Sequence, residues 1–273
     1  FRNRHLTISV PSLRIESFSV NLMDRLKEVR PGGGFTLAPE AATERMRRII
    51  NKPVETEQLY ETARAVFQHG WTSLKLYFMI GHPSETLEDV QAIADVCKKV
   101  LAIGKQEIGG RAKVHAGVST FVPKPHTPFQ WGACDTEDQI LSKQTLLRHE
   151  LRNPSLKMTW NNPHDTFLES WLARGDRRTS QLIYTAWKNG ARFDAWQDQF
   201  RYPIWLEAFE TCGLDPAFYS HRLRDLNEIL PWDHISTGVR KSYLAEEYQW
   251  SQEGKTRQDC REQCFACGIL PTF

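Results

Sequence analysis

The stretch KLYFMIGHPSETLED, residues 75–89, decides how the chain folds. Alternate residues from 74 to 80 are apolar, which is the period of a β-strand with one buried face. Residues 81–84 contain a glycine and a proline, and they predict a loop. Thr86 with Asp89 resembles a capping box, so we expect a helix to begin there. A strand, a loop and a helix in this order form half of a β–α–β unit.

The same pattern recurs on both sides of this stretch. Residues 35–38 and 113–121 predict further strands, with starts about 40 residues apart, and residues 6–10 predict an earlier strand. Apolar stripes predict helices near 43–50, 56–70 and 86–104. We expect Thr56 to cap the second helix and Gly104 to end the third. Alternating strands and helices pair in parallel, so a (β/α) barrel or an open α/β sheet is expected and a β-sandwich is not.

The second half of the chain has a different pattern. Helical periodicity dominates after Cys134, and only residues 156–160 could form another strand. The expected helices are 140–151, 166–173, 180–188, 201–211 and 215–230. We therefore predict three parts: residues 1–134 as the C-terminal part of a barrel, 135–258 as a helical extension, and 259–273 as a Cys-rich tail.

Composition is that of an ordinary globular protein. The chain has 273 residues, 40% hydrophobic and 25% charged, with a formal net charge of +2. This charge gives no electrostatic support for RNA binding or for an anionic membrane surface. No apolar run approaches the roughly 18 residues of a membrane span, so no membrane partner is expected. Because the first residue is Phe1 and a strand pattern follows at once, we expect the sequence to begin inside a longer protein.

The six cysteines are unevenly spread along the chain. Cys97, Cys134 and Cys212 stand alone, whereas the other three crowd residues 260–267. This is not the even spacing of a secreted disulfide framework. We therefore expect a reducing, cytoplasmic setting.

Polar side chains follow the predicted strands at the point where each strand ends. Glu40 follows the first, His82 and Glu85 the second, and Lys124 and His126 the third. The carboxyl ends of parallel strands meet at one edge of a sheet, where functional groups gather. Each of these residues is also consistent with a solvated loop position.

Four segments, taken in order, resemble the radical S-adenosylmethionine (radical SAM) superfamily. Residues 9–14 are similar to the end of its third strand, and residues 36–52 to its fourth strand and helix. Residues 75–89 resemble its fifth strand and the Gly-x-Pro-x-Glu-Thr-x-Glu-Asp pattern, and residues 121–129 its sixth strand and Pro-x-Thr-Pro turn. The resemblance implies a partial (β/α)6 barrel, strands three to six, with a mainly helical C-terminal extension.

The similar branch contains the methylthiotransferases, the Elongator catalytic subunit and the coproporphyrinogen dehydrogenases. The chain also resembles uncharacterised bacterial radical SAM proteins that carry an N-terminal cobalamin-binding-like domain. Use of cobalamin is therefore left open.

The resemblance implies SAM-contacting roles at matched positions. Glu40 would bond the ribose hydroxyls, and Lys52 would pair with the methionine carboxylate, without the bidentate fork of an arginine. Arg45 could reach the same cleft. Tyr77 stands where some relatives have a ribose-binding Asp, so the ribose contact rests more on Glu40. The backbone that would line the adenine comprises Met79, Ile80, Gly81, Phe121 and Val122.

The superfamily also needs a Cys-x3-Cys-x2-Cys motif for a [4Fe-4S] cluster whose fourth iron binds SAM. That spacing occurs once, at Cys260, Cys264 and Cys267, far beyond the barrel strands, so we expect the cluster ligands upstream of residue 1. We interpret the three tail cysteines as an accessory site for zinc or an auxiliary iron–sulfur cluster. Asp259 or His234 could supply a fourth zinc ligand. Free thiols in a loose tail are the other interpretation.

The resemblance implies reductive cleavage of SAM to a 5′-deoxyadenosyl radical that abstracts a substrate hydrogen, with a reductant such as a flavodoxin or ferredoxin. We expect no catalytic acid, base or nucleophile in this chain, which would be an inactive fragment on its own. The substrate is not readable, with RNA or protein modification both open. The alternative is a non-catalytic RNA- or protein-binding module stabilised by zinc.

The charged run at residues 174–178, Arg-Gly-Asp-Arg-Arg, allows two interpretations. It could be a solvated helix junction with a glycine cap, or an edge that contacts an anionic substrate or RNA.

Overall fold

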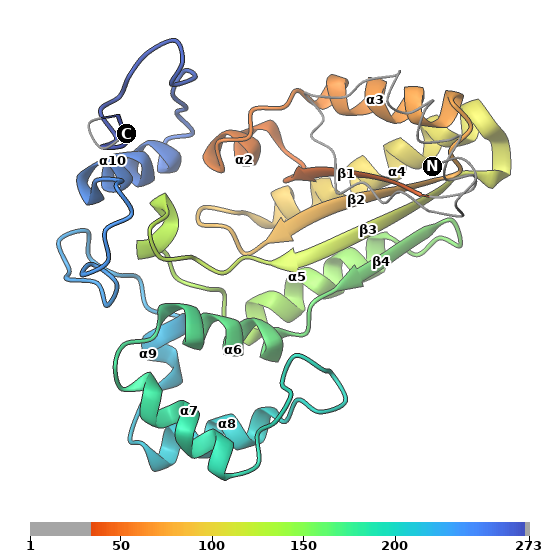
Figure 1. Ribbon diagram of the computed structural model, residues 1–273. Coiled ribbons are helices and arrows are strands. Elements are labelled where there is room, and N and C mark those ends of the chain that lie inside the picture. The colour runs from red at the N-terminus through yellow and green to blue at the C-terminus, as the bar shows by residue number, and fades with distance from the viewer. Residues whose placement is uncertain (1–33, 271–273) are drawn as a thin grey trace, which may run out of the picture. The chain divides into compact units, whose positions relative to one another are not determined.

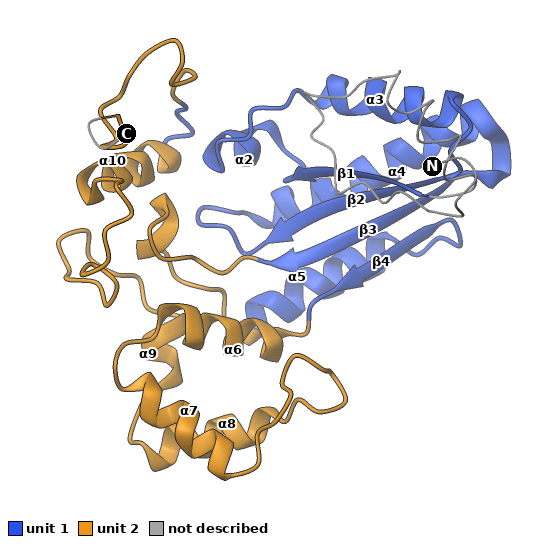
Figure 2. Ribbon diagram, viewed as in Figure 1, with its two compact units in different colours: residues 1–120, 138–161, 253–256 blue, residues 121–137, 162–252, 257–273 orange. Residues whose placement is uncertain are grey.

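The computed structural model describes residues 34–270, which form two compact units (Figure 2). The first unit comprises residues 1–120, 138–161 and 253–256, and the second comprises residues 121–137, 162–252 and 257–273. The strand expected at 6–10 and the match at 9–14 lie outside the described residues. The units divide the chain at other positions than the predicted parts do, because residues 138–161 return to the first unit.

The first unit is built on a parallel sheet of four strands in the order β1-β2-β3-β4 (Figure 1). Its strands are β1 (Phe35–Glu40), β2 (Ser73–Ile80), β3 (Lys113–Thr120) and β4 (Leu156–Trp160). All three pairings are parallel, and the β1–β2 register shifts between Leu37 and Glu40. The α/β class is therefore confirmed, and the sheet is consistent with part of the expected barrel.

This unit also contains helices, three of which share one hydrophobic core with the sheet. The helices are α2 (Glu44–Ile49), α3 (Thr56–Gln68), α4 (Leu87–Ile108) and α5 (Glu137–Glu150), with the short η1 (Gly109–Arg111) after α4. The core joins the alternate side chains of the strands to α3, α4 and α5, as with Leu76, Val66, Val90 and Leu147. The capping box predicted for α4 is confirmed, because Thr86 and Asp89 bond each other's backbone.

Two local expectations in these helices are wrong. Glu55, not Thr56, is the N-cap of α3, because its backbone is extended and its carbonyl accepts from the Leu59 N–H at 3.3 Å. Gly104 does not end α4, which runs four residues further to Ile108. Its role is close packing: a Cβ at Gly104 would lie 2.7 Å from the Phe67 ring. Such a contact between helices leaves no room for a side chain.

The two faces of β2 differ in burial. Leu74, Leu76, Phe78 and Ile80 are buried, whereas the alternate residues, such as Tyr77, are half-buried or exposed. Lys75 Nζ lies 4.5 Å from the centroid of the Tyr77 ring. The sheet therefore has one face in the hydrophobic core and a second, more polar face.

The second unit is helical, as expected. It contains η2 (Pro128–Trp131), α6 (Pro163–Arg174), α7 (Thr179–Lys188), α8 (Tyr202–Thr211), α9 (Pro216–Ser220) and α10 (Lys241–Gln252). The helix predicted over 215–230 is wrong beyond Ser220, because Arg224 N donates to Trp131 O at 2.9 Å instead of continuing a helix. In residues 34–270, no helix is long and apolar enough to cross a membrane.

Candidate functional site

The carboxyl end of β1 carries an ion pair. Glu40 is the last residue of the strand and has φ 65°, in the left-handed region. Its carboxylate lies 3.3 Å from Lys52 Nζ, and Lys52 also donates to the carbonyl of Ala38. The side chains of Glu40 and Lys52 are 28% and 22% exposed, so both remain within reach of a ligand.

Arg45 is held at the start of the helix α4. It pairs with Asp89, and its Nη2 also donates to the carbonyl of Ser84 at 3.0 Å. Thr43, the N-cap of α2, donates from Oγ1 to the same carboxylate at 2.6 Å. Burial alone would raise the pKa of Asp89, but hydrogen bonds from Thr43, Thr86 and Arg45 hold the pKa below its ordinary value. This network ties α2 to the loop that follows β2.

A second ion pair lies after β2. The Gly81 N–H donates to Glu85 Oε2 at 2.8 Å, and Lys143 of α5 donates to the same oxygen at 2.6 Å. The Glu85 side chain is 4% exposed and that of Lys143 is 11% exposed, so this pair is nearly buried. Burial, assisted by the nearby Lys143 charge, lowers the pKa of His82 to about 4. His82 is therefore neutral at pH 7.

The remaining predicted SAM contacts fall in both units. Met79 is half-buried, while Ile80 is buried in the core. Gly81 follows them with φ 87°, a conformation that favours glycine. Phe121 and Val122 follow β3 in the sequence and are the first residues of the second unit. The first unit thus brings together Glu40 with Lys52, and separately Arg45 with Asp89, while the SAM-binding roles of these residues stay predictions.

The cysteine tail belongs to the second unit. Cys260 and Cys264 are exposed, and Cys267 is half-buried. Asp259 forms an ion pair with Arg261 at 2.8 Å, and that pairing holds the pKa of its carboxyl below the ordinary value. Within the part of the chain that is described, no three His, Cys, Asp or Glu residues are grouped to hold a metal ion. The arrangement therefore does not fit zinc or a cluster as it stands, and the metal site remains a prediction.

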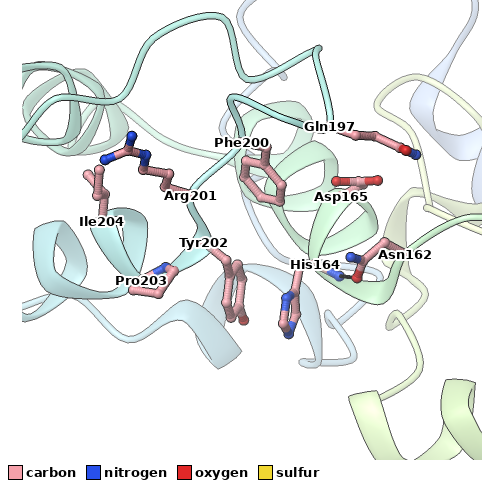
Figure 3. A pocket seen from close by; sticks show the side chains of 9 residues that line it. All are labelled: Asn162, His164, Asp165, Gln197, Phe200, Arg201, Tyr202, Pro203 and Ile204. Carbon is pink, nitrogen blue, oxygen red and sulfur yellow. Dashed lines mark hydrogen bonds between the residues drawn. The ribbon is translucent and has the colours of Figure 1, made fainter.

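A pocket of about 730 Å³ lies within the second unit, between the starts of α6 and α8 (Figure 3). The rings of His164 and Tyr202 stack with centroids 3.8 Å apart and an interplanar angle of 1°. His164 Nε2 lies 3.0 Å from Glu137 Oε1. Burial raises the pKa of Asp165, which lines the same pocket. The carboxylate of Asp165 and the amide of Gln197 thus line this pocket beside the His164 imidazole, which is already paired.

The sequence did not point to this pocket. Asn162 and Pro163 are recognisable as a helix start, and they place His164 and Asp165 in the first turn of α6. The stacking of His164 on Tyr202 joins residues 38 positions apart, which no local pattern signals.

The first part of the chain is similar to a known protein family. Residues 1–97 match the radical SAM superfamily domain, which among the described residues covers β1, α2, α3, β2 and the first half of α4. The chain is also 32% identical over 176 residues to the "Uncharacterized protein MJ0966" of Methanocaldococcus jannaschii. That alignment covers 64% of this chain and 37% of the relative, so the chain spans little more than a third of that protein. Residues 1–97 are therefore similar to the radical SAM superfamily domain.

Proposed function

We propose that this chain is part of a radical SAM enzyme and that the carboxyl edge of its sheet binds SAM. The observation that carries the proposal is the Glu40–Lys52 pair, which lies at the end of β1 inside the segment matched by the superfamily domain. Ligands of parallel α/β folds bind at this edge of the sheet.

The pair offers both charges that SAM requires. The Glu40 carboxylate can accept hydrogen bonds from two ribose hydroxyls, and the Lys52 ammonium can pair with the methionine carboxylate. Arg45 already holds Asp89 and the Ser84 carbonyl, so we assign it to positioning the loop after β2. The Gly81 N–H is similarly engaged by Glu85, which fixes the backbone proposed to line the adenine.

The [4Fe-4S] cluster needs ligands that the described sheet unit does not offer. Its one described cysteine, Cys97, is fully buried, and burial raises the pKa of this thiol to about 12. A ligand must be a thiolate, so Cys97 does not fit. We therefore propose that a cysteine motif elsewhere in the full-length protein holds the cluster. In this family the reduced cluster supplies the electron that cleaves SAM to methionine and a 5′-deoxyadenosyl radical.

The test is SAM affinity in the full-length protein with its cluster reconstituted, measured by calorimetry. Glu40→Ala should weaken SAM binding by roughly 1–3 kcal/mol, because charge-assisted hydrogen bonds to the ribose are lost. Glu61→Ala, which removes an exposed carboxylate from α3 of the same unit, is the matched control and should bind as the wild type does. Equal SAM affinity in Glu40→Ala and Glu61→Ala, with both folded by circular dichroism, would reject the assigned role.

A further inference from the structure

The charged run at residues 174–178 lines a pocket of about 520 Å³ within the second unit. Residues 218–234 form the rest of its wall. The ionised side chains of the lining are Arg174, Arg177, Arg178, Arg222, Arg224, Asp176, Glu228 and Asp233. Five guanidinium groups therefore meet three carboxylates.

Arg174, the last residue of α6, is 0% exposed. Its Nε donates to the carbonyl of Tyr219 at 3.0 Å. Among the described residues, nothing accepts a hydrogen bond from Nη1 or Nη2. A buried cation without an acceptor is strongly disfavoured, and an arginine cannot escape by losing its proton. The lining of the pocket thus includes a buried arginine with two strong donors that lack a partner.

Arg224 adds a second buried charge. It is 4% exposed, its Nη2 donates to the Arg174 carbonyl at 3.1 Å, and its guanidinium lies 4.9 Å from the Trp232 ring centroid. Burial and the charges of Arg174 and Arg222 lower the pKa of Arg224 to about 10, so it still carries its proton at pH 7. The two buried guanidinium groups repel each other.

The carboxylates of the lining are already paired with other cations. Asp176 binds Arg178 at 2.6 Å, and Glu228 forms a bidentate pair with Arg222 at 2.7 Å. Asp233 pairs with Lys241 at 2.5 Å. Across the described part of the chain, no carboxylate forms an ion pair with Arg174 or Arg224. The lining of the pocket therefore carries an excess of positive charge.

We propose that this pocket binds a phosphoryl group, either as inorganic phosphate or as the phosphate of a small monoester. A phosphate carries about 1.5 to 2 negative charges at pH 7, which is close to the excess of two cations in the lining. Its oxygens suit the paired donors of a guanidinium, including Nη1 and Nη2 of Arg174. Phe218, Ile229 and Leu230 also line the pocket and offer apolar surface to an organic group. This site is independent of the proposed SAM function, because SAM carries no phosphate.

The test titrates the full-length protein with inorganic phosphate and with glycerol 3-phosphate, by calorimetry in chloride buffer of constant ionic strength. Saturable binding of either compound supports the proposal, and the tighter ligand identifies the source of the phosphoryl group. A single-stranded RNA without terminal phosphates is titrated in parallel. Binding of the RNA alone would assign this surface to a nucleic-acid backbone and overturn the proposal, as would no saturable binding of either phosphate compound.

Three variants distinguish phosphate binding in the pocket from nonspecific attraction of phosphate to the positive charge of the protein. Arg174→Gln should weaken phosphate binding by about tenfold or more, because it removes charge-assisted donors. Arg222→Gln should have an effect of the same size, because it leaves the Glu228 carboxylate unpaired in the lining, where it repels an anion. Arg222 is 30% exposed, so its variant stays informative even if Arg174→Gln does not fold. Arg201→Gln removes an exposed arginine that lines the pocket at the starts of α6 and α8, and this variant should bind phosphate within about twofold of the wild type. Unchanged affinity in Arg222→Gln would overturn the proposal.

Discussion

Two fully buried arginines show how the units differ. In the sheet unit, Arg47 donates to the carbonyls of Ala41 and Ala42, at 3.2 and 2.9 Å, and to the Thr56 hydroxyl at 2.5 Å. Only its Nε lacks an acceptor in the described structure. In the helical unit, Arg174 has one acceptor, the carbonyl of Tyr219. Both side chains are 0% exposed. Both Nη groups of Arg47 have an acceptor, whereas within residues 34–270 neither Nη group of Arg174 has one.

This difference teaches that burial alone does not assign a role to a charged residue. Hydrogen bonds that join Arg47 to the loop before α2 and to the start of α3 make it part of the fold. A buried guanidinium with free donors contributes little to the fold and is better suited to a ligand. The predictions below test this contrast, beginning with the largest effect.

Removal of the Arg47 side chain should strongly destabilise the sheet unit. Arg47→Ala leaves two carbonyls and a hydroxyl without their donor and opens a cavity, so we expect the free energy of unfolding to fall by about 3–5 kcal/mol. Urea unfolding followed by circular dichroism measures this. Arg48→Ala, one position along the same helix and exposed, should change stability by less than about 0.5 kcal/mol. A loss of less than about 1 kcal/mol for Arg47→Ala would contradict the structural role assigned to Arg47.

His82 should make the sheet unit sensitive to acid. Its folded-state pKa of about 4 lies below the ordinary 6.5, so the unfolded chain binds a proton first as the pH falls. Stability should therefore decrease from about pH 6.5 to pH 4, by about 3 kcal/mol in total, and this loss should be absent in His82→Gln. Unfolding measured at intervals of half a pH unit gives the slope. His149→Gln, an exposed histidine of the same unit, should keep the slope of the wild type.

The capping box of α4 should have a moderate effect. Thr86→Ala removes the hydroxyl that accepts from Asp89 N and should cost about 1 kcal/mol, whereas Thr86→Ser should retain most of the stability. Because Asp89 also holds Arg45, this variant probes whether the site loop depends on the helix start. Equal unfolding midpoints for Thr86→Ala and Thr86→Ser would show that the box is unimportant.

The smallest effect should come from Arg174, although it is as buried as Arg47. Arg174→Met loses one hydrogen bond but relieves an uncompensated charge, so stability in phosphate-free buffer should stay within about 1 kcal/mol of the wild type. Phosphate should raise the melting temperature of the wild type and not of the variant. A loss as large as that of Arg47→Ala would show that Arg174 is structural.

The sequence predicted most of the sheet because the strands have a clear apolar alternation. It also located the N-cap Thr86, whose bonds are local. It placed the N-cap of α3 at Thr56 instead of Glu55. It gave no sign that Thr56 bonds to Glu44 and Arg47 of another helix. The Glu40–Lys52 pair was not predicted either, since it depends on the turn of β1 into α2. These contacts are tertiary, and no periodicity signals them.

The helical unit was harder to predict. Helix α10 was not expected at all, and the apolar residues between 221 and 230 imitated a helix although Asp225 forms a local turn with Asn227 N at 2.7 Å. The burial of Arg174 has no signal in the sequence, because arginine is usually found at the surface.

The path of the chain between the units has a consequence for synthesis on the ribosome. Strand β3 ends at Thr120 and its neighbour β4 starts at Leu156, because the chain first enters the second unit and then builds α5. At roughly 5–20 residues per second, the intervening 35 residues take about 2–7 seconds to emerge. Helices form in microseconds, so β3 waits with one edge unpaired for far longer than its neighbours need to fold. During that interval the nascent chain is open to pairing with another strand, and a chaperone that covers this edge would have its greatest effect there.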